Sequence, residues 1–418
     1  MQVTETVHMH GHLLDSGILS KVLDDIREYG GDYVINRFDV GKDHEDESKV
    51  WLQVGTDEDL QLQRLLMRLQ THGVNLVDHD DVLIRTADRD GVFPDDFYST
   101  TNLDTLIRYE GRWIPVENPE MDCGLVVSGT GSAVTVRTVP MSDVKAGERI
   151  VCGAHGVRVV ALPIHHEKSA DAFEFMNSVV SSEKPQALLV RQIAQQMREV
   201  KAAGGRILWV AGPAVVHTGA APAMVALVEN DFVDVLFAGN ALATHDIEAS
   251  MFGTSLGMDL AKGAGVEHGH EHHIRAINKI RGAGSIANAV ADGTLTGGVM
   301  HALVQADKPF VLVGSVRDDG PLPDVYTDVV EGQRAMRAQL RGVGYAIMVA
   351  TMLHSIATGN IMPATIPLVC VDINPATVTK LSDRGSAQAV GVVTDIGLFL
   401  EQLALDLVPA FRRSGDSV

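Results

Sequence analysis

Cysteine, aromatic residues and positive charge are all scarce in this chain of 418 residues. The three cysteines, Cys123, Cys152 and Cys370, have no short metal-type spacing, and an odd number cannot form a complete disulfide framework. The formal net charge of -20 argues against a concentrated basic face for nucleic acid. We therefore expect reduced thiols, no nucleic-acid partner and a small-molecule substrate.

Long apolar runs are also missing. The runs present are too short, or too interrupted by glycine, to span a membrane, and the N-terminus MQVTETVHMHGH lacks the basic and apolar regions of a signal peptide. We therefore expect a cytoplasmic protein with no membrane partner. The length favours two or three domains.

Short apolar runs recur after residue 200, each followed by a small, polar or acidic cluster. ILWVAG precedes GPAVVHTGAAP, VDVLFAGN precedes ALATHDIE, FVLVGS precedes VRDDGPLPD, LVCV precedes DINPATVTKL and AVGVV precedes TDIGLFLEQL. This pattern predicts a buried parallel sheet, and ligands of such sheets bind beyond the carboxyl ends of the strands. We expect one composite nucleotide site there, formed by Gly212, Asn240, Asp319, Asp372 and Asp395.

The first part of the chain, residues 1–110, predicts a small α/β domain of its own. TVHMHGHLL, DYVINRFDV and KVWLQVG read as strands, and Asp15 or Ser16 can cap a helix that runs to Tyr29. A second helix is predicted over residues 57–72. The order βαββα indicates a ferredoxin-like module.

Two further domains are expected after a boundary near residues 105–115. Residues 111–190 contain the strand-like runs GLVVSG, AVTVRTV and GVRVVAL and the helix-like DAFEFMNSVVSSEK, which indicates a small mixed subdomain. Residues 191–418 alternate strands and helices, which predicts a Rossmann-like parallel-sheet domain with right-handed crossovers. The fold class is therefore α/β throughout.

A glycine-rich turn, GPAVVHTGAAPAMVALV, lies between the first parallel strand and its helix. Its backbone N–H groups, near Gly212, Gly219 and Pro222, could face a phosphate at the helix N-terminus. The turn has no GxGxxG fingerprint, and an ordinary strand-to-helix turn would also use these residues.

Three further residues each have a ligand role and a structural role open to them. Asp372 ends an apolar strand, where a carboxylate can accept the hydroxyl groups of a ribose or cap the next helix. Asp395 in VVTDIG has the same two roles open. His354 is on an apolar helix, where it could contact a cofactor or be a satisfied core residue.

The histidine-rich segment VEHGHEHHIRAINKIRG raises the question of a zinc site. Its four histidines, His268, His270, His272 and His273, have no accompanying HExxH pattern or cysteine pair. A solvated loop before a helix explains the composition equally well, so we predict no metal.

Ionisable residues cluster beyond two of the predicted strands, which indicates either a reaction site or a structural ion-pair network. One cluster follows VDVLFAG and contains Asn240, His245, Asp246 and Glu248. The other follows FVLVG and contains Arg317, Asp318 and Asp319.

Several of these segments, taken together, resemble one family. FEFMNSVVSSEKP, GPAVVHTGA, AGNALATHDIE, GTSLGMDL, GSVRDDGPLPDV, TMLHSIATGN, VDINPATVTKLSDRGS and VVTDIG resemble the archaeal-type ornithine cyclodeaminases, which also form the C-terminal half of cyanobacterial arginine dihydrolase proteins. The first hundred residues resemble the domain that this family shares with lysine-ketoglutarate reductase/saccharopine dehydrogenase proteins.

The resemblance implies NAD bound in a Rossmann-like domain akin to that of deoxyhypusine synthase, which would explain the missing GxGxxG. It also implies conversion of ornithine to proline and ammonia. The NAD contacts that it implies are Asn240, Ala241, Asp319, Thr351, Met352, Leu353, His354, Asp372, Asp395 and Ile396.

A redox-neutral cyclodeamination uses NAD as a recycled hydride carrier and needs three protein groups. A base must hold the α-amine neutral; Asp246 is the leading candidate, His245 the next, and Glu248 lies beside them. A cation must grip the α-carboxylate, and the candidates are Arg158, Arg275 and Arg317. The δ-ammonium needs a carboxylate, for which Glu248 and Asp318 are the candidates.

Two other functions remain open on sequence grounds. Another NAD-dependent reaction on a basic amino acid, such as lysine cyclodeamination or a net oxidation, differs by too little in the substrate for sequence to decide. A non-catalytic sensor of an amino acid and NAD is the second alternative. Whichever function holds, we expect a homo-oligomer.

Overall fold

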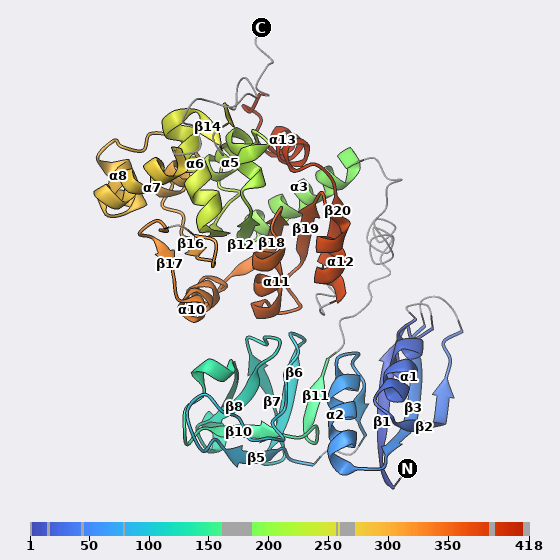
Figure 1. Cartoon of the computed structure of the whole chain (residues 1–418). Coiled ribbons are helices and arrows are strands. Elements are labelled where there is room, and N and C mark those ends of the chain that lie inside the picture. Colours follow the sequence, from blue (N-terminus) through green and yellow to red (C-terminus); the bar gives the residue numbers. More distant parts are fainter. Residues whose placement is uncertain are drawn as a thin grey trace. The chain divides into compact units, whose positions relative to one another are not determined.

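The computed structural model describes residues 2–14, 17–42, 46–77, 80–160, 186–255, 258–259, 272–318, 320–383 and 389–412. The chain divides into two compact units, which are shown in Figure 1. The first unit is Met1–Glu174 with Asn360–Thr365, and the second is Phe175–Gly359 with Ile366–Val418. No helix within the described ranges is both long and apolar enough to cross a bilayer.

The first unit begins with the predicted ferredoxin-like module. Its antiparallel sheet has the order β2-β3-β1-β4, so β4 adds a short strand to the predicted βαββα order. Residues Asp15 and Ser16, the predicted helix caps, lie outside the described ranges. The elements are β1 (Val3–Gly11), α1 (Ile18–Glu28), β2 (Asp32–Asp39), β3 (Ser48–Thr56), α2 (Asp59–Gln70) and β4 (Asn75–Leu76).

A buried carboxylate joins the two helices of this module. Asp25 of α1 is only 7% exposed, and its Oδ2 lies 2.8 Å from both Nε of Arg68 and Nε2 of His72. The apolar face of α1, with Val22 and Ile26, packs into the same core. The ion pair fixes how α1 meets α2 while the apolar face supplies the burial.

The rest of the first unit is a seven-stranded mixed sheet of order β11-β6-β7-β9-β8-β10-β5. All its pairs are antiparallel except β7 with β9. The predicted helix DAFEFMNSVVSSEK lies outside the described residues, and the domain boundaries at 110 and 190 stay predictions. The strands are β5 (Leu83–Thr86), β6 (Thr105–Tyr109), β7 (Arg112–Glu117), β8 (Gly124–Ser128), β9 (Thr135–Val139), β10 (Arg149–Cys152) and β11 (Val157–Val159), with 3-10 turns at Gly131–Ala133 and Met141–Asp143.

The second unit is built on a parallel sheet of order β17-β16-β13-β12-β18-β19-β20. Every neighbouring pair is parallel, as the continuous apolar runs predict. Its strands are β12 (Arg206–Ala211), β13 (Val235–Gly239), β16 (Phe310–Val313), β17 (Val325–Tyr326), β18 (Val343–Val349), β19 (Leu368–Asp372) and β20 (Ala389–Val393).

Helices cover both faces of this sheet (Figure 1). The largest apolar cluster lies between the sheet and one group of helices and includes Trp209, Phe399 and Leu403. The remaining elements are α3 (Gln186–Ala202), α4 (Ala214–His217), α5 (Ala221–Glu229), α6 (Asn240–Phe252), β14 (Thr254–Ser255), β15 (Met258–Asp259), α7 (His272–Ala283), α8 (Ile286–Ala291), α9 (Val299–Gln305), α10 (Val329–Gln339), α11 (Met352–Ile361), α12 (Pro375–Asp383) and α13 (Ile396–Leu407).

The order of the parallel strands reverses between β12 and β18. From β12 the chain moves outward through β13 and β16, and it later returns to place β18 on the other side of β12. This is the Rossmann order, in which the carboxyl ends of the two strands at the reversal leave a crevice for a ligand. We call the region between the carboxyl ends of β12 and β18 the switch point.

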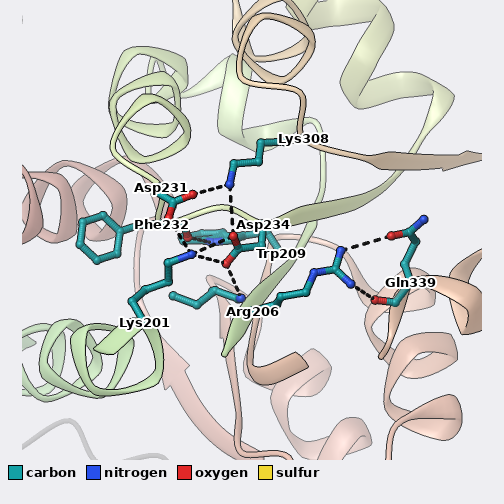
Figure 2. A network of polar contacts seen from close by, with 9 residues as sticks. Lys201, Arg206, Trp209, Asp231, Phe232, Asp234, Lys308 and Gln339 are labelled. Carbon is teal, nitrogen blue, oxygen red and sulfur yellow. Dashed lines mark hydrogen bonds and ion pairs between the residues drawn. The ribbon is translucent and has the colours of Figure 1, made fainter. Parts of the chain in front are cut away.

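An ion-pair network ties the opposite, amino-terminal edge of this sheet together (Figure 2). Asp234, directly before β13, accepts hydrogen bonds from Nζ of Lys201 at 2.8 Å and Nζ of Lys308 at 3.2 Å. It also accepts one from the backbone N–H of Ile207 at 2.8 Å. Asp231 pairs with the same two lysines. The network therefore joins α3 and the starts of three neighbouring strands.

We expect Asp234→Asn to lower the free energy of unfolding by about 2 kcal/mol, because a carboxylate only 9% exposed would lose two cationic partners. Chemical denaturation followed by circular dichroism measures the change. Asp231→Asn is the matched control: its carboxylate is 61% exposed and should contribute less than about 1 kcal/mol. If both variants lose the same free energy of unfolding, the buried Asp234 contributes no more than the exposed Asp231 and the prediction is wrong.

Candidate active site

The predicted cofactor residues gather along the carboxyl edge of the parallel sheet. They lie at the carboxyl ends of five different strands, so the sheet brings together segments spread over nearly half the chain. Asp319 lies outside the described residues. The other predicted positions are Gly212 after β12, Asn240 and Ala241 after β13, Thr351 to His354 after β18, Asp372 at the end of β19, and Asp395 and Ile396 after β20.

The switch point has room for backbone but not for an added side chain. A Cβ built on Gly212 would lie 2.0 Å from the carbonyl oxygen of Ala350. Ala350 itself has φ of 52°, in the left-handed region that a non-glycine residue occupies at a cost. The chain therefore maintains a strained turn directly before Thr351, at the place where this fold binds its ligand.

His354 lies beside the carboxyl end of β13, the strand next to β12. A Cβ on Gly239 would lie 3.2 Å from its Cε1, so the histidine ring lies against the turn that starts α6. Burial lowers the pKa of His354, although contacts with the Val313 backbone and Asp318 oppose that shift. Leu353, its neighbour, is 78% exposed. The imidazole of His354, favoured in its neutral form, and the exposed side chain of Leu353 are suited to contact a flat, uncharged ring.

Asp372 and Asp395, the two carboxylates predicted to bind a ribose, make different contacts within the protein. Asp372 is half-buried and accepts a hydrogen bond from the N–H of Asn374 through Oδ1 at 2.8 Å. Asp395 is exposed and caps α13, because its Oδ1 accepts from the N–H of Leu398 at 3.0 Å. Both carboxylates therefore have a local structural contact, and neither contact occupies both oxygens.

Asn240 anchors the start of α6. Its Oδ1 accepts from the backbone N–H of Leu322 at 3.1 Å and from the hydroxyl of Thr244 at 3.3 Å. The loop after β16 is shaped by Asp318, which accepts from the N–H of Ser315 at 2.7 Å. Arg317 is exposed in that loop.

Asp246 makes the contacts of a helix cap. Its Oδ1 accepts from the N–H of Val299 and its Oδ2 from the N–H of Met300, both at 2.8 Å. The side chain therefore binds the N-terminus of α9, where the helix dipole favours negative charge. Asp246 is 1% exposed, and burial raises its pKa to about 6 although the two backbone hydrogen bonds oppose the shift. The assignment of Asp246 as the base stays a prediction, and in this geometry a substrate amine has no open path to it.

His245 and Glu248 form a buried pair on the same helix. Nδ1 of His245 lies 2.9 Å from Oε2 of Glu248, and Glu248 is fully buried. The hydroxyl of Thr254 donates to Oε1 of Glu248 at 3.0 Å and lies 2.8 Å from Nδ1 of His272. We call His245, Glu248, Thr254 and His272 the Glu248 network.

A second histidine faces this network from α4, the short helix after β12. The ring centroid of His217 lies 4.9 Å from that of His245, and its Nδ1 is 2.6 Å from the hydroxyl oxygen of Ser255. Burial, followed by the proximity of His245, lowers the pKa of His217. The sequence prediction did not include His217, Thr254 or Ser255 as site residues, although they lie in GPAVVHTGA and GTSLGMDL, two of the segments that resemble the family. Their contacts with one another and with His245 could not be found without the structure.

The three arginines predicted to grip a carboxylate belong to different elements: Arg158 to β11, Arg275 to α7 and Arg317 to the loop after β16. Arg158 belongs to the first unit, where its guanidinium lies 4.2 Å from the ring centroid of Trp113. Arg275 is exposed on α7, in the helix that also carries His272 and His273.

Within the described ranges there is no group of three or more side chains able to hold a metal ion, and His268 and His270 lie outside those ranges.

These features fit a dinucleotide. The reversal of strand order supplies the crevice, and Gly212 allows close approach of the backbone where any Cβ would clash. Asp372 retains an oxygen for hydroxyl groups. Of the two other predicted turn residues, Gly219 has φ of 79° and Pro222 is in the first turn of α5.

Family comparisons match nearly all of the chain. Residues 4–103 match the LOR/SDH bifunctional enzyme conserved region, and residues 104–190 match the first region of the C-terminal part of arginine dihydrolase ArgZ-like proteins. Residues 191–403 match the Rossmann-fold region of the same C-terminal part. The predicted Rossmann-like class of the second unit is therefore confirmed.

Individual relatives extend over the same length. An ornithine cyclodeaminase of Methanothermobacter thermautotrophicus is 50% identical over 95% of this chain and 96% of its own. The crystal structure of ArgZ, a cyanobacterial arginine dihydrolase, has a TM-score of 0.84 at 37% identity, covering 97% of this chain and 58% of that one. A structure of AgrE in ternary complex with ornithine and NAD+ has a TM-score of 0.52 at 40% identity, covering 97% and 57%.

The Asp246 cap predicts a particular pH dependence of stability. Its folded-state pKa, about 6, is above the ordinary value of 3.8, so this carboxyl contributes stability at low pH that is lost as the pH rises through 6. Asp246→Asn removes that titration, and its amide would also set an N–H donor against one helix N–H. We expect the variant to be less stable than wild type at pH 5 by about 2 kcal/mol.

The difference should narrow as the pH is raised from 5 to 7.5, because only wild type loses this contribution. Urea unfolding at each pH measures both curves. A gap that is constant with pH would contradict the raised pKa, and equal stability of the two proteins would contradict the cap.

Proposed function

Because this chain belongs to the ornithine cyclodeaminase family, we propose that it converts ornithine to proline and ammonia with NAD as a recycled hydride carrier. The observation that carries this proposal is the strand-order reversal at Gly212 and Ala350, in the same unit as a buried histidine–glutamate pair. A dinucleotide crevice and an acid–base group are what a redox-neutral deamination requires.

The residues proposed to hold NAD are those along the carboxyl edge. Gly212 and the strained Ala350–Thr351 turn would face the dinucleotide backbone, and Asp372 would accept ribose hydroxyl groups. Asn240 and His354 would line the crevice beside them. Bound NAD supplies a hydride acceptor that returns the same hydride, so no net oxidation occurs.

We propose His245, rather than Asp246, as the base for the α-ammonium of ornithine. Both oxygens of Asp246 already accept helix N–H groups, and its side chain is sealed from solvent. His245 has an acidic partner on one ring nitrogen, which supports proton uptake at the other. Its neighbour His217 follows the turn at the switch point, which supports a location near the reacting carbon.

The groups that bind the two ends of ornithine remain proposals. Arg317 and Arg275 are exposed cations of the second unit and could pair with the α-carboxylate. Asp318 remains a candidate for the δ-ammonium, whereas the contacts of Glu248 favour a role toward His245. Arg158 would have to act from the first unit. A cytoplasmic location and assembly as a homo-oligomer also stay predictions.

The decisive experiment is incubation of the purified protein with ornithine and catalytic NAD. We expect proline and ammonia in equal amounts with no lasting absorbance of NADH, because the hydride is returned. Lysine in parallel tests substrate choice, since one methylene is worth only about 1 to 3 kcal/mol in an apolar pocket. Accumulating NADH would overturn the proposal in favour of a dehydrogenase, and tight NAD binding without turnover would favour a sensor.

The cofactor site has its own test. Asp372→Ala should weaken NAD binding by about ten-fold or more, because hydrogen bonds from ribose hydroxyls to a carboxylate are charge-assisted. Isothermal titration measures the affinity. Asp328→Ala is the matched control, since Asp328 caps α10 through the N–H groups of Val330 and Glu331. Unchanged affinity in Asp372→Ala would remove the ribose contact.

A further inference from the structure

The Glu248 network joins three titratable side chains: Glu248 contacts His245 directly and His272 through the hydroxyl of Thr254. Glu248 is fully buried, yet each of its carboxylate oxygens has a side-chain partner: Oε2 has Nδ1 of His245 at 2.9 Å, and Oε1 has Oγ1 of Thr254 at 3.0 Å. Thr254 in turn lies 2.8 Å from Nδ1 of His272. The network connects α6 to β14 and to the first residue of α7.

Counting protons along the network fixes the direction of each hydrogen bond. With Glu248 taken as ionised, both of its oxygens only accept, so Thr254 donates its single hydroxyl proton to Oε1 and His245 carries a proton on Nδ1. Because the hydroxyl proton is used, Oγ1 of Thr254 accepts from Nδ1–H of His272. His245 is thereby left with Nε2 as its proton-accepting nitrogen.

We infer that Glu248, Thr254 and His272 form a positioning relay that holds His245 in the tautomer whose Nε2 can act as the base. This inference rests on the proposed function. Nε2 takes one proton from the α-ammonium of ornithine, and the carboxylate of Glu248 stabilises the resulting imidazolium. The same proton returns to that nitrogen when its bond to carbon breaks and it departs as ammonia. The δ-ammonium gives up two protons, one before its nitrogen attacks and one as ammonia is expelled. One of these ends on the proline nitrogen and the other on the released ammonia, so the protons balance over the cycle.

The contacts of Glu248 differ in kind from those of Asp246, two residues earlier, and favour more than a structural role for Glu248. Both oxygens of Asp246 accept hydrogen bonds from backbone N–H groups, which cannot change protonation state. Oε2 of Glu248 instead contacts His245, which can change protonation state, and Oε1 accepts from the hydroxyl of Thr254. The other histidines near His245 are His217, at 4.9 Å between ring centroids, and His273, at 6.4 Å. The carboxylate of Glu248 compensates an added charge on His245 in this histidine-rich surrounding.

The tautomer can be measured directly in the full-length protein by ¹⁵N NMR of labelled histidine, with His245→Gln used to assign the resonances. In wild type we expect Nδ1 of His245 to be protonated and Nε2 to be an acceptor. Glu248→Gln presents an amide N–H that can donate to Nδ1, so the proton should move to Nε2 in all or part of the population. An unchanged tautomer would overturn the relay.

Kinetics supply the second readout. A wrong tautomer in a comparable histidine–carboxylate pair lowers kcat by about 10⁴, so we expect Glu248→Gln to lose at least about 10²-fold in kcat. The affinity for NAD and the KM for ornithine should stay within about two-fold, and the pH dependence of kcat should shift. A loss of NAD affinity with an unchanged pH profile would indicate a merely structural role and overturn the inference.

Thr254 provides a matched pair of variants in case Glu248→Gln does not fold. Thr254→Ser keeps the hydroxyl and should leave kcat and the tautomer unchanged, whereas Thr254→Val removes it at equal volume and should lower kcat by about ten-fold. Equal kinetics of the two would overturn the relay. If wild type makes no proline but the tautomer still moves in Glu248→Gln, the proposed function fails while the relay stands.

Discussion

The direct pairing of β12 with β18 is the constraint on which the second unit depends. The two strands start more than 130 residues apart in the chain, yet they form parallel partners from Ile207 to Ala211. Because the chain leaves in opposite directions from this pair, neither connection crosses the carboxyl ends, and a crevice opens there. The glycine at 212 and the strained turn at Ala350 are both consequences of how closely those ends approach.

Much of this arrangement could be predicted from sequence, because continuous apolar runs and the clusters after them are local signals. The strand order could not, and one central strand was missed: VGYAIMV, which is β18, continues directly into the apolar helical segment ATMLHSIATGNIMP and was not separated from it. Without β18 the reversal of strand order is invisible. The ferredoxin-like module was predicted except for β4, which is only two residues long.

The candidate site shows the same division between local and spatial information. Sequence named Asn240, His245, Asp246 and Glu248 as a cluster, and all four are buried on α6. Their roles differ because of partners that sequence could not supply. Asp246 meets the start of α9, more than 50 residues later, whereas Glu248 meets Thr254 and through it His272. The sequence alone does not distinguish a helix-capping carboxylate from the acidic partner of a histidine, because Asp246 and Glu248 are both acidic residues two positions apart on α6.

The ion-pair network at the amino-terminal edge of the sheet has a consequence for how the unit responds to heat. The hydration of charged groups becomes less favourable as temperature rises, so the cost of keeping Asp234 with Lys201 and Lys308 away from water falls. Apolar burial per unit area gains little over the same range. Warming therefore shifts the balance of forces within this unit, and a larger share of the stability comes from the charged edge at which the strands start.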